Sequence, residues 1–252
     1  MIQVRYKGRL GNQLFQYCFG RILAEQLGYR LDAEPVEGFS GTCEKVSGTE
    51  YDESNPLIFS GVEYPDIEQL LRERPNRRII INAYLQRYAY YAHHLEKIRK
   101  WLRLTNYDRR DFSAGPDSLT IHIRLGDYLK CHWTLAPEYY IQQIETIPHQ
   151  SLVIVTDSPD STFLEQFTQY QPRIVHGAIL ADFKWLLNAQ RLVLSQSTFG
   201  WWAALLSDAE VWMPEPGNSI WSQDSHIDLR VVDNPRWHIV PAEILNPGHP
   251  YA

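Results

Sequence analysis

Hydroxyl-bearing and charged residues gather in two short turns, and each turn could hold an anion. The first is SQSTFGWW, residues 195–202, which follows one apolar run and precedes another. That pattern predicts a strand, a turn and a helix, so the turn presents hydroxyl groups and free backbone N–H groups at a helix N-terminus. A phosphate group fits such a position. The alternative is that Ser197 or Thr198 only caps the helix.

The second turn is HIRLGDY, residues 122–128, at the end of a predicted strand. Residues two apart on a strand share a face, so His122 and Arg124 can reach one ligand. The guanidinium of Arg124 is a planar, permanently charged fork that suits phosphate oxygens. Gly126 lets the backbone pass close to a ligand, and Asp127 can hold Arg124 through an ion pair. The alternative is an Arg–Asp pair that only closes a turn, with His122 in the core.

A third turn, GRLGNQ over residues 8–13, follows the first predicted strand and opens the first helix. Gly8 and Gly11 form GxxG rather than GxGxxG, and Arg9 occupies the place of the second glycine of a dinucleotide motif. Two interpretations stay open. The turn only lets the helix pack on the sheet, or its residues, with Asn12 and Gln13, support a phosphate.

Asp182 opens the helix that is predicted over residues 182–190. Its carboxylate is either an N-cap or a first-turn acid of that helix, or it accepts two hydrogen bonds from guanine N1–H and N2–H, a pair that adenine cannot supply. No HxxxH, HExxH or DxD pattern is present, so we expect no metal site. No GxSxG hydrolase signature occurs.

Alternating strand and helix patterns must position these turns. Strands are predicted over 2–6, 29–32, 78–82, 119–123, 152–155, 173–176, 192–194 and 210–213, and helices over 12–27, 66–74, 89–104, 138–147, 161–170 and 182–190. Gly28 ends the first helix, and residues 34–64 are predicted to form one long loop. Such alternation implies parallel sheets with ligands at the carboxyl ends of the strands, where the turns at 122–128 and 195–199 and the segment 156–159 lie.

The polar segment 106–117 contains Gly-Pro and marks the predicted domain boundary. We expect an α/β protein in two parts. Residues 1–110 form an N-terminal α/β domain on the acceptor side, and residues 111–252 form a C-terminal Rossmann-like nucleotide domain. A cleft is expected between them.

The composition excludes several classes of protein. Hydrophobic residues at 44% and charged residues at 21% are typical of a globular protein. The net charge of −6, without a basic tract, argues against a nucleic-acid partner, although a nucleotide needs only local positive groups. No signal peptide and no apolar run of the roughly 18–20 residues of a membrane span is found. Three irregularly spaced cysteines predict free thiols in a reducing cytoplasm, with one secreted-type disulfide as the alternative.

Three segments together resemble glycosyltransferase family 11, the α-1,2-fucosyltransferases. Residues 8–17 (GRLGNQLFQY) resemble its opening motif, and residues 122–128 are similar to its HxRRGDY motif. Residues 182–203 resemble its D-x₂-LM…NSTFSWWxA segment. The order and spacing match from residue 1 to about residue 215.

The resemblance implies a GT-B fold, in which two Rossmann-like domains face a cleft, with GDP-fucose as donor and no required metal or other cofactor. It also implies inversion at the anomeric carbon of fucose. Arg124 would be the catalytic residue that holds the diphosphate and stabilises the departing GDP. His122 would contact the nucleotide, and Asp182 would recognise guanine. The further phosphate-binding residues that it implies are Ser197, Thr198 and Phe199.

Four residues depart from the pattern of that family. Leu125 stands where a second arginine is usual, and Arg9 replaces a glycine. Gln196 replaces an asparagine, and Gly200 replaces a serine. These departures bear on donor affinity and acceptor choice more than on the class of reaction.

We therefore expect an α-1,2-fucosyltransferase that acts on a galactose-containing glycan in bacterial surface polysaccharide assembly. It would be cytoplasmic or peripheral to the inner membrane, without an integral membrane segment. Two alternatives stay open: an enzyme of the same fold with another nucleotide sugar or linkage, and a protein that binds GDP-sugars without transfer. The missing GxGxxG disfavours an NAD-dependent oxidoreductase.

Overall fold

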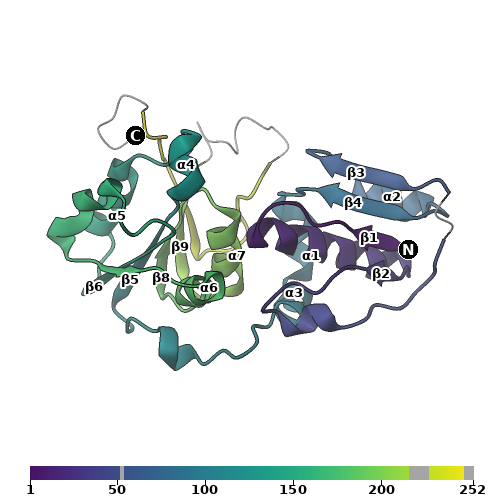
Figure 1. Ribbon diagram of the computed structural model, residues 1–252, viewed down its shortest axis with the longest axis horizontal. Coiled ribbons are helices and arrows are strands. Elements are labelled where there is room, and N and C mark those ends of the chain that lie inside the picture. Colours follow the sequence, from purple (N-terminus) through teal and green to yellow (C-terminus); the bar gives the residue numbers. More distant parts are fainter. Residues whose placement is uncertain (52–53, 216–226, 247–252) are drawn as a thin grey trace. The chain divides into compact units, whose positions relative to one another are not determined.

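The computed structural model describes residues 1–51, 54–215 and 227–246 (Figure 1). The chain divides into two compact units between Asn106 and Tyr107. This observed boundary lies close to residue 110, where the sequence predicts it. Unit 1 contains Met1–Asn106 and takes back residues 227–229 from the C-terminal part of the chain. Unit 2 contains the remaining described residues from Tyr107 onward.

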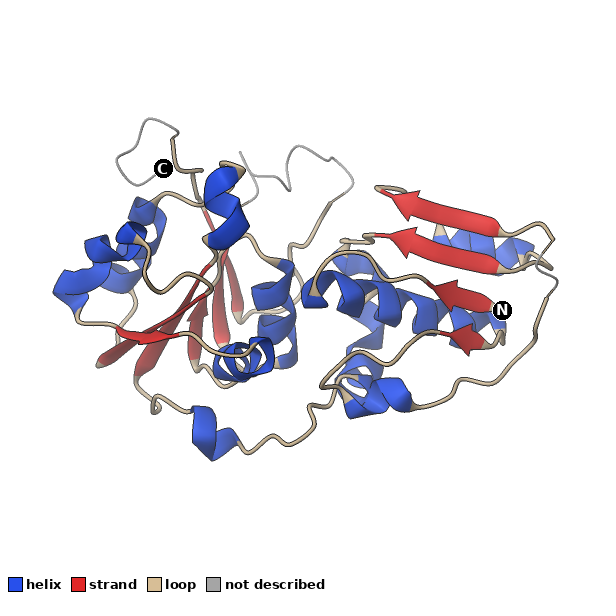
Figure 2. Ribbon diagram, in the orientation of Figure 1, coloured by secondary structure: helices blue, strands red, loops and turns tan. Residues whose placement is uncertain are grey.

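Unit 1 is built on a parallel sheet of four strands in the order β2-β1-β4-β3 (Figure 2). The strands are β1 (Ile2–Val4), β2 (Leu31–Asp32), β3 (Leu57–Gly61) and β4 (Ile79–Ala83). The helices are α1 (Leu10–Leu27), α2 (Ile67–Glu73) and α3 (Leu95–Trp101).

Helix α1 forms the centre of the packing in unit 1. It is buried along most of its 18 residues, and Gly20 brings it close to β1, because a Cβ there would lie 2.5 Å from Val4 Cγ2. Gly28 ends the helix in the left-handed conformation with φ +73°, as the sequence predicts. The helix begins at Leu10, so Gly11, Asn12 and Gln13 lie in its first turn rather than in a loop.

Two predictions for unit 1 are wrong in part. Residues 34–64 are not one loop, because they contain β3 and a short 3₁₀ helix, η1 (Ser40–Cys43). The predicted helix over 89–104 is α-helical only in α3, preceded by two 3₁₀ turns, η2 (Tyr88–Tyr90) and η3 (Ala92–His94). The strands at β1, β2 and β4 and the helix α2 are confirmed, with shorter bounds for β1 and β2.

Unit 2 is built on a parallel sheet of six strands in the order β10-β9-β8-β5-β6-β7. The strands are β5 (Ser118–Ile123), β6 (Ser151–Thr156), β7 (Arg173–Val175), β8 (Arg191–Val193), β9 (Glu210–Pro214) and β10 (Trp237–Val240). The helices are η4 (Arg109–Phe112), α4 (Gly126–Lys130), α5 (Pro137–Thr146), η5 (Thr162–Tyr170), α6 (Ile179–Leu187) and α7 (Thr198–Leu206). Right-handed crossovers place α5 and η5 on one face and α6 and α7 on the other.

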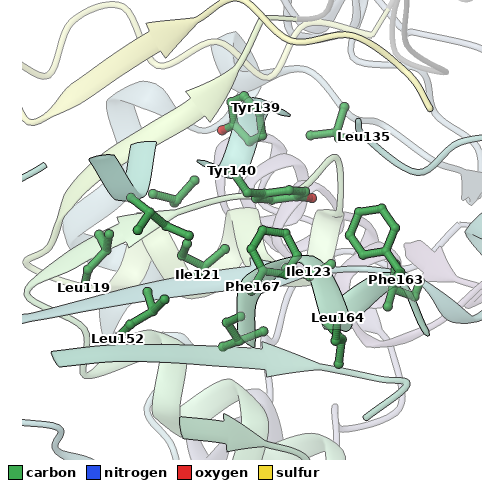
Figure 3. Packing of buried hydrophobic residues seen from close by; sticks show 14 of the residues in the cluster. Leu119, Ile121, Ile123, Leu135, Tyr139, Tyr140, Leu152, Phe163, Leu164 and Phe167 are labelled. Atoms are coloured by element: carbon green, nitrogen blue, oxygen red, sulfur yellow. The ribbon is translucent and has the colours of Figure 1, made fainter. Parts of the chain in front are cut away.

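The core of unit 2 lies under α5 and η5, where aromatic rings pack on the central strands. Figure 3 shows Tyr140 and Phe167 beside Ile121 and Leu152, all of them buried. Alternate residues of β5 point to the opposite face, so His122 lies against α7 rather than in this cluster. Strand β5 therefore carries core side chains on one face and a functional candidate on the other.

Five predicted strands of unit 2 are confirmed, and the sequence missed β10. The segment predicted as a helix over 161–170 is the 3₁₀ helix η5. Helix α6 begins at Ile179 with Ala178 as its N-cap, so Asp182 does not open this helix but is the acidic residue of its first turn. Within the described ranges, no helix combines the length and the apolarity that crossing a bilayer requires.

Candidate functional site

The candidate site lies at the carboxyl edge of the unit 2 sheet, at the point where the path of the chain across the sheet reverses. From β5 the chain moves outward to β6 and β7, and then returns through α6 to β8 on the other side of β5. Such a change between neighbouring parallel strands is the usual ligand position in open α/β sheets. The residues that follow these strand ends are Arg124, Asp157, His176, Ser195 and Ser197.

His122 bridges the two strands at this point. Its ring is buried, and its Nδ1 lies 3.0 Å from the hydroxyl oxygen of Ser195 at the end of β8. Burial, with the nearby charge of Arg124, lowers the pKa of His122 to about 3. His122 is therefore a neutral hydrogen-bonding group at physiological pH, not an imidazolium.

The first turn of α7 packs directly on that imidazole. A Cβ at Gly200 would lie 2.4 Å from His122 Nδ1, so only glycine leaves room for the ring. The ring of Phe199 lies 5.8 Å from the His122 ring and 5.4 Å from that of Phe183 in α6. The departure at Gly200 has a local consequence, because a larger residue here would require the His122 ring or α7 to move.

Arg124 lies between two carboxylates. Its Nη2 is 2.5 Å from Oδ1 of Asp127, which confirms the ion pair that the sequence predicts, and its Nη1 is 2.7 Å from Oδ2 of Asp157. The guanidinium carbon lies 5.4 Å from the centre of the Tyr128 ring, and the side chain is 15% exposed. A permanently charged, planar donor is thus held at the carboxyl end of β5.

The sequence places the segment 156–159 at the ligand edge, but it assigns no role to Asp157 or Ser158. Asp157 Oδ1 accepts the backbone N–H of Leu125 at 2.9 Å, and Ser158 Oγ accepts that of Gly126 at 3.2 Å. A Cβ at Gly126 would lie 2.4 Å from Asp157 Oδ2, so glycine is needed there for the close approach of this carboxylate. The signal in the sequence that points to these two residues is that both are polar and directly follow a buried strand.

The turn before α7 is more deeply buried than a simple surface cap. Ser197 is the N-cap residue of α7, but its side chain makes no capping hydrogen bond. Its backbone N–H donates to the Ser195 carbonyl at 2.8 Å, and Ser195, Gln196 and Ser197 are all at most 5% exposed. The opening N–H groups of a helix, here at Thr198 and Phe199, have no intrahelical acceptors.

Asp182 is a buried carboxylate with an unused acceptor. It is 8% exposed, and its Oδ1 has no hydrogen-bond partner among the described residues. Burial raises its pKa to about 6, against the opposing effects of His176 and of a hydrogen bond from the Gly177 backbone. Such a carboxylate is costly unless a ligand completes its hydrogen bonds.

Comparison with known proteins decides the family. The family model described as glycosyl transferase family 11 matches residues 80–213, more than half of the chain. The chain belongs to glycosyltransferase family 11. An Escherichia coli α-1,2-colitosyltransferase is 25% identical over 84% of this chain and 89% of its own length.

Two solved structures share the GT-B fold of this family 11 chain. FUT1 of Arabidopsis thaliana, in complex with GDP, has a TM-score of 0.55 at 14% identity over 88% of this chain and 72% of its own. The α-1,6-fucosyltransferase NodZ from Bradyrhizobium, soaked with GDP-fucose, has a TM-score of 0.50 at 16% identity over 82% of this chain and 92% of its own.

The family 11 match covers the whole candidate site of unit 2, from β5 to α7. It leaves out residues 8–13. There Gly8 has φ +79°, Gln13 Nε2 donates to the Gly8 carbonyl at 3.4 Å, and Asn12 Oδ1 accepts Gln86 Nε2 at 2.9 Å. These contacts support the turn at the end of β1, and any role toward a phosphate stays a prediction.

Leu125, where family 11 usually has a second arginine, is fully buried in the core cluster of unit 2. A phosphate contact from this position is therefore replaced by hydrophobic packing, and the site has one arginine at the end of β5. Among residues that the structure describes, no group of three or more His, Cys, Asp or Glu side chains is arranged for a metal ion.

Proposed function

We propose that this family 11 glycosyltransferase is an inverting, metal-independent fucosyltransferase that moves L-fucose from GDP-fucose to the 2-hydroxyl of a galactose in a glycan. The observation that carries the donor assignment is the buried carboxylate of Asp182, whose Oδ1 has no hydrogen-bond partner among the described residues and which interacts with His176 and Asp157 at the strand ends. Asp182 can recognise a base, and Arg124 can hold a diphosphate.

Guanine fits Asp182 better than any other common base. A carboxylate accepts the N1–H and N2–H pair of guanine, whereas adenine has no such pair of donors. The ligand would also relieve the cost of a buried acceptor that lacks its hydrogen bond. The GDP and GDP-fucose in the two solved structures of the same fold support this choice.

The leaving GDP gains negative charge as the bond to the sugar breaks. We propose that Arg124 and the N–H groups at Thr198 and Phe199 stabilise that charge, with the hydroxyl of Ser197 as a further donor. His122 is neutral at physiological pH, so it contributes hydrogen bonding to the nucleotide rather than charge. This arrangement needs no metal ion to neutralise the diphosphate.

The α-1,2 linkage rests on the family resemblance and on the printed activity of the E. coli relative. That relative is a colitosyltransferase, and this observation favours a second candidate donor with another deoxy sugar in place of fucose. The NodZ enzyme, with the same fold, makes a 1,6 linkage, so the fold alone does not fix the linkage.

A donor and acceptor screen tests the proposal. The protein is incubated with GDP-fucose, GDP-colitose, GDP-mannose and UDP-galactose, with and without simple galactosides, and nucleotide release and glycoside products are measured. We expect galactoside-dependent release of GDP from GDP-fucose and an α-1,2-linked product by NMR. If only GDP-colitose is a donor, the transferred sugar is colitose rather than fucose. If only UDP-galactose is turned over, the assignment of Asp182 to guanine is refuted.

A further inference from the structure

The two carboxylates that hold Arg124 differ in how they are anchored. Asp157 binds both the guanidinium of Arg124 and the backbone N–H of the next residue, whereas Asp127 belongs to the short helix α4. We propose that Asp157 is the fixed positioning residue of Arg124, and that Asp127 is an exchangeable counter-ion that the donor diphosphate displaces. The inference rests on the proposed GDP-sugar function and deepens it.

Asp157 has little freedom to leave Arg124. It directly follows β6, whose last residue, Thr156, is paired with Ile123 at the end of β5, so the two strand ends carry Asp157 and Arg124 side by side. One carboxylate oxygen accepts the Leu125 N–H, and the other lies against Gly126. A side chain held at both oxygens sets the direction of the guanidinium.

Asp127 is held less firmly. Its side chain is 46% exposed, compared with 26% for Asp157, and its pair with Arg124 is a local one, three residues apart along the chain. Water reaches the Asp127 carboxylate and can solvate it when the pair separates, whereas Asp157 is more shielded. Displacing Asp127 therefore costs less than displacing Asp157.

Charge balance requires one of the two carboxylates to give way. Two carboxylates and one guanidinium leave a local net charge of about −1, next to the position where a diphosphate must bind. A guanidinium has five N–H donors, so it can keep one carboxylate and still hold phosphate oxygens. Loss of the Asp127 pair removes the repulsion, while retention of the Asp157 pair keeps the geometry.

Calorimetric titration with GDP tests the division of roles. Asp157→Asn keeps an oxygen for the Leu125 N–H but loses the charge beside Arg124, so we expect GDP to bind at least about ten-fold more weakly. Asp127→Asn removes the competing counter-ion, and we expect GDP to bind about two- to five-fold more tightly. Equal weakening in both variants would overturn the inference.

Two controls separate positioning from general damage. Asp108→Asn breaks a comparable pair with Arg110 outside the site, where Arg110 Nη2 lies 2.6 Å from Asp108 Oδ2, and GDP affinity should not change. In an Arg124→Met background, Asp157→Asn should no longer weaken GDP binding, because the group it positions is gone. Ten-fold weakening that persists in this background would contradict the inference even if Asp157→Asn lowers the melting temperature.

The two proposals fail differently. A wild-type protein that does not bind GDP refutes the proposed function and this inference with it. If the wild-type protein binds GDP and Asp157→Asn binds it with the same affinity, only the positioning role is refuted. In the donor assay, Asp157→Asn should lower kcat more than it raises KM, because the charge on GDP develops mainly in the transition state.

Discussion

Three ionisable side chains determine what the site can bind. His122 is neutral because burial lowers its pKa to about 3, and Arg124 is a permanent cation held by carboxylates. Asp182 is a carboxyl group whose pKa burial raises to about 6. In the proposed function, Arg124 is the cation for phosphate and Asp182 is the group that recognises the base, and His122 cannot serve as a protonated general acid near neutral pH.

Arg124→Ala should abolish transfer while the fold stays intact. In the proposed mechanism its guanidinium holds the diphosphate and matters most as negative charge develops on the departing GDP, so its loss should lower kcat by about 10²–10³. Turnover on GDP-fucose measures the effect, with circular dichroism as the check on folding. Arg110→Ala is the control, because that arginine is 89% exposed and lies outside the site. Near-normal turnover of Arg124→Ala would remove the central step of the mechanism.

Asp182→Asn should weaken GDP binding and stabilise the free protein. The amide cannot accept both guanine hydrogens, which should cost about 1.5–3 kcal/mol of binding free energy by calorimetry. The folded pKa of Asp182 is raised, so the folded state binds more protons, and wild-type stability falls as pH rises from about 4 to about 6. The Asp182→Asn variant should not show this loss of stability between about pH 4 and about pH 6. Unchanged GDP affinity would return Asp182 to a structural role in α6.

The elements place these side chains through contacts between β5, β6, β8 and α7. The His122–Ser195 bond joins the ends of β5 and β8, and the Arg124–Asp157 pair joins the ends of β5 and β6. Gly200 and Gly126 are the points where a helix or turn approaches these side chains most closely. The elements therefore tolerate no added side chain at either glycine.

Gly200→Ala should distort the site. Its new Cβ would meet His122 Nδ1 at 2.4 Å, so the ring or α7 must move, at a cost of about 1–3 kcal/mol in the free energy of unfolding. Denaturant unfolding and GDP titration measure the change. Gly177→Ala is the control for the free energy of unfolding alone, because its Cβ would make an ordinary contact, 3.6 Å from Asp182 Oδ1, the acceptor that is proposed for guanine. Equal losses in the free energy of unfolding in the two variants would show that the contact with His122 is not the cause of the loss.

The sequence predicts the strands of unit 2 well because each is an apolar run between polar turns. It misses β3, an edge strand in which Ile58 and Ser60 are exposed and which lies within a polar segment. It misplaces the start of α6 because Ala178 is not a typical capping residue. The Arg124–Asp157 pair depends on the register of two strands, which periodicity alone cannot supply.

At the scale of the whole molecule, the chain is two α/β units, each with its own parallel sheet, in the fold of known GT-B enzymes. The reversal of the chain's path across the parallel sheet between β5 and β8 explains why the two motifs of unit 2, far apart in sequence, meet at one sheet edge. The motif spacing indicated this arrangement because both turns follow predicted strands.

The proposed enzyme should work without a divalent metal. Arg124 and the opening N–H groups of α7 take over the charge neutralisation that a metal ion provides in other transferases. Turnover on GDP-fucose should therefore stay within about two-fold after exhaustive treatment with EDTA. Activity that disappears with EDTA and returns with Mn²⁺ or Mg²⁺ would contradict this part of the proposal.

No single carboxylate over residues 32–66 should be indispensable for catalysis. If the transition state is strongly oxocarbenium-like, the acceptor hydroxyl loses its proton late and needs no strong base. Several of these acids already have structural partners. Asp32 accepts Gln3 Nε2 at 3.0 Å, Glu44 pairs with Arg21 at 2.8 Å, and Asp66 caps α2 by accepting the Gln69 N–H at 2.9 Å. Asp52 and Glu53 lie outside the described residues.

An alanine scan of these acids measures this prediction directly, with GDP-fucose binding and kcat recorded for every variant. Glu44→Ala is the internal reference for structural damage, because its partner Arg21 is buried and also binds Tyr17 at 2.9 Å. We expect its melting temperature to fall, while kcat per folded molecule stays within about ten-fold. One variant that folds, binds GDP-fucose normally and loses about 10³ or more in kcat would identify a catalytic base. The reaction would then depend on a carboxylate of unit 1 as well as on the arginine of unit 2.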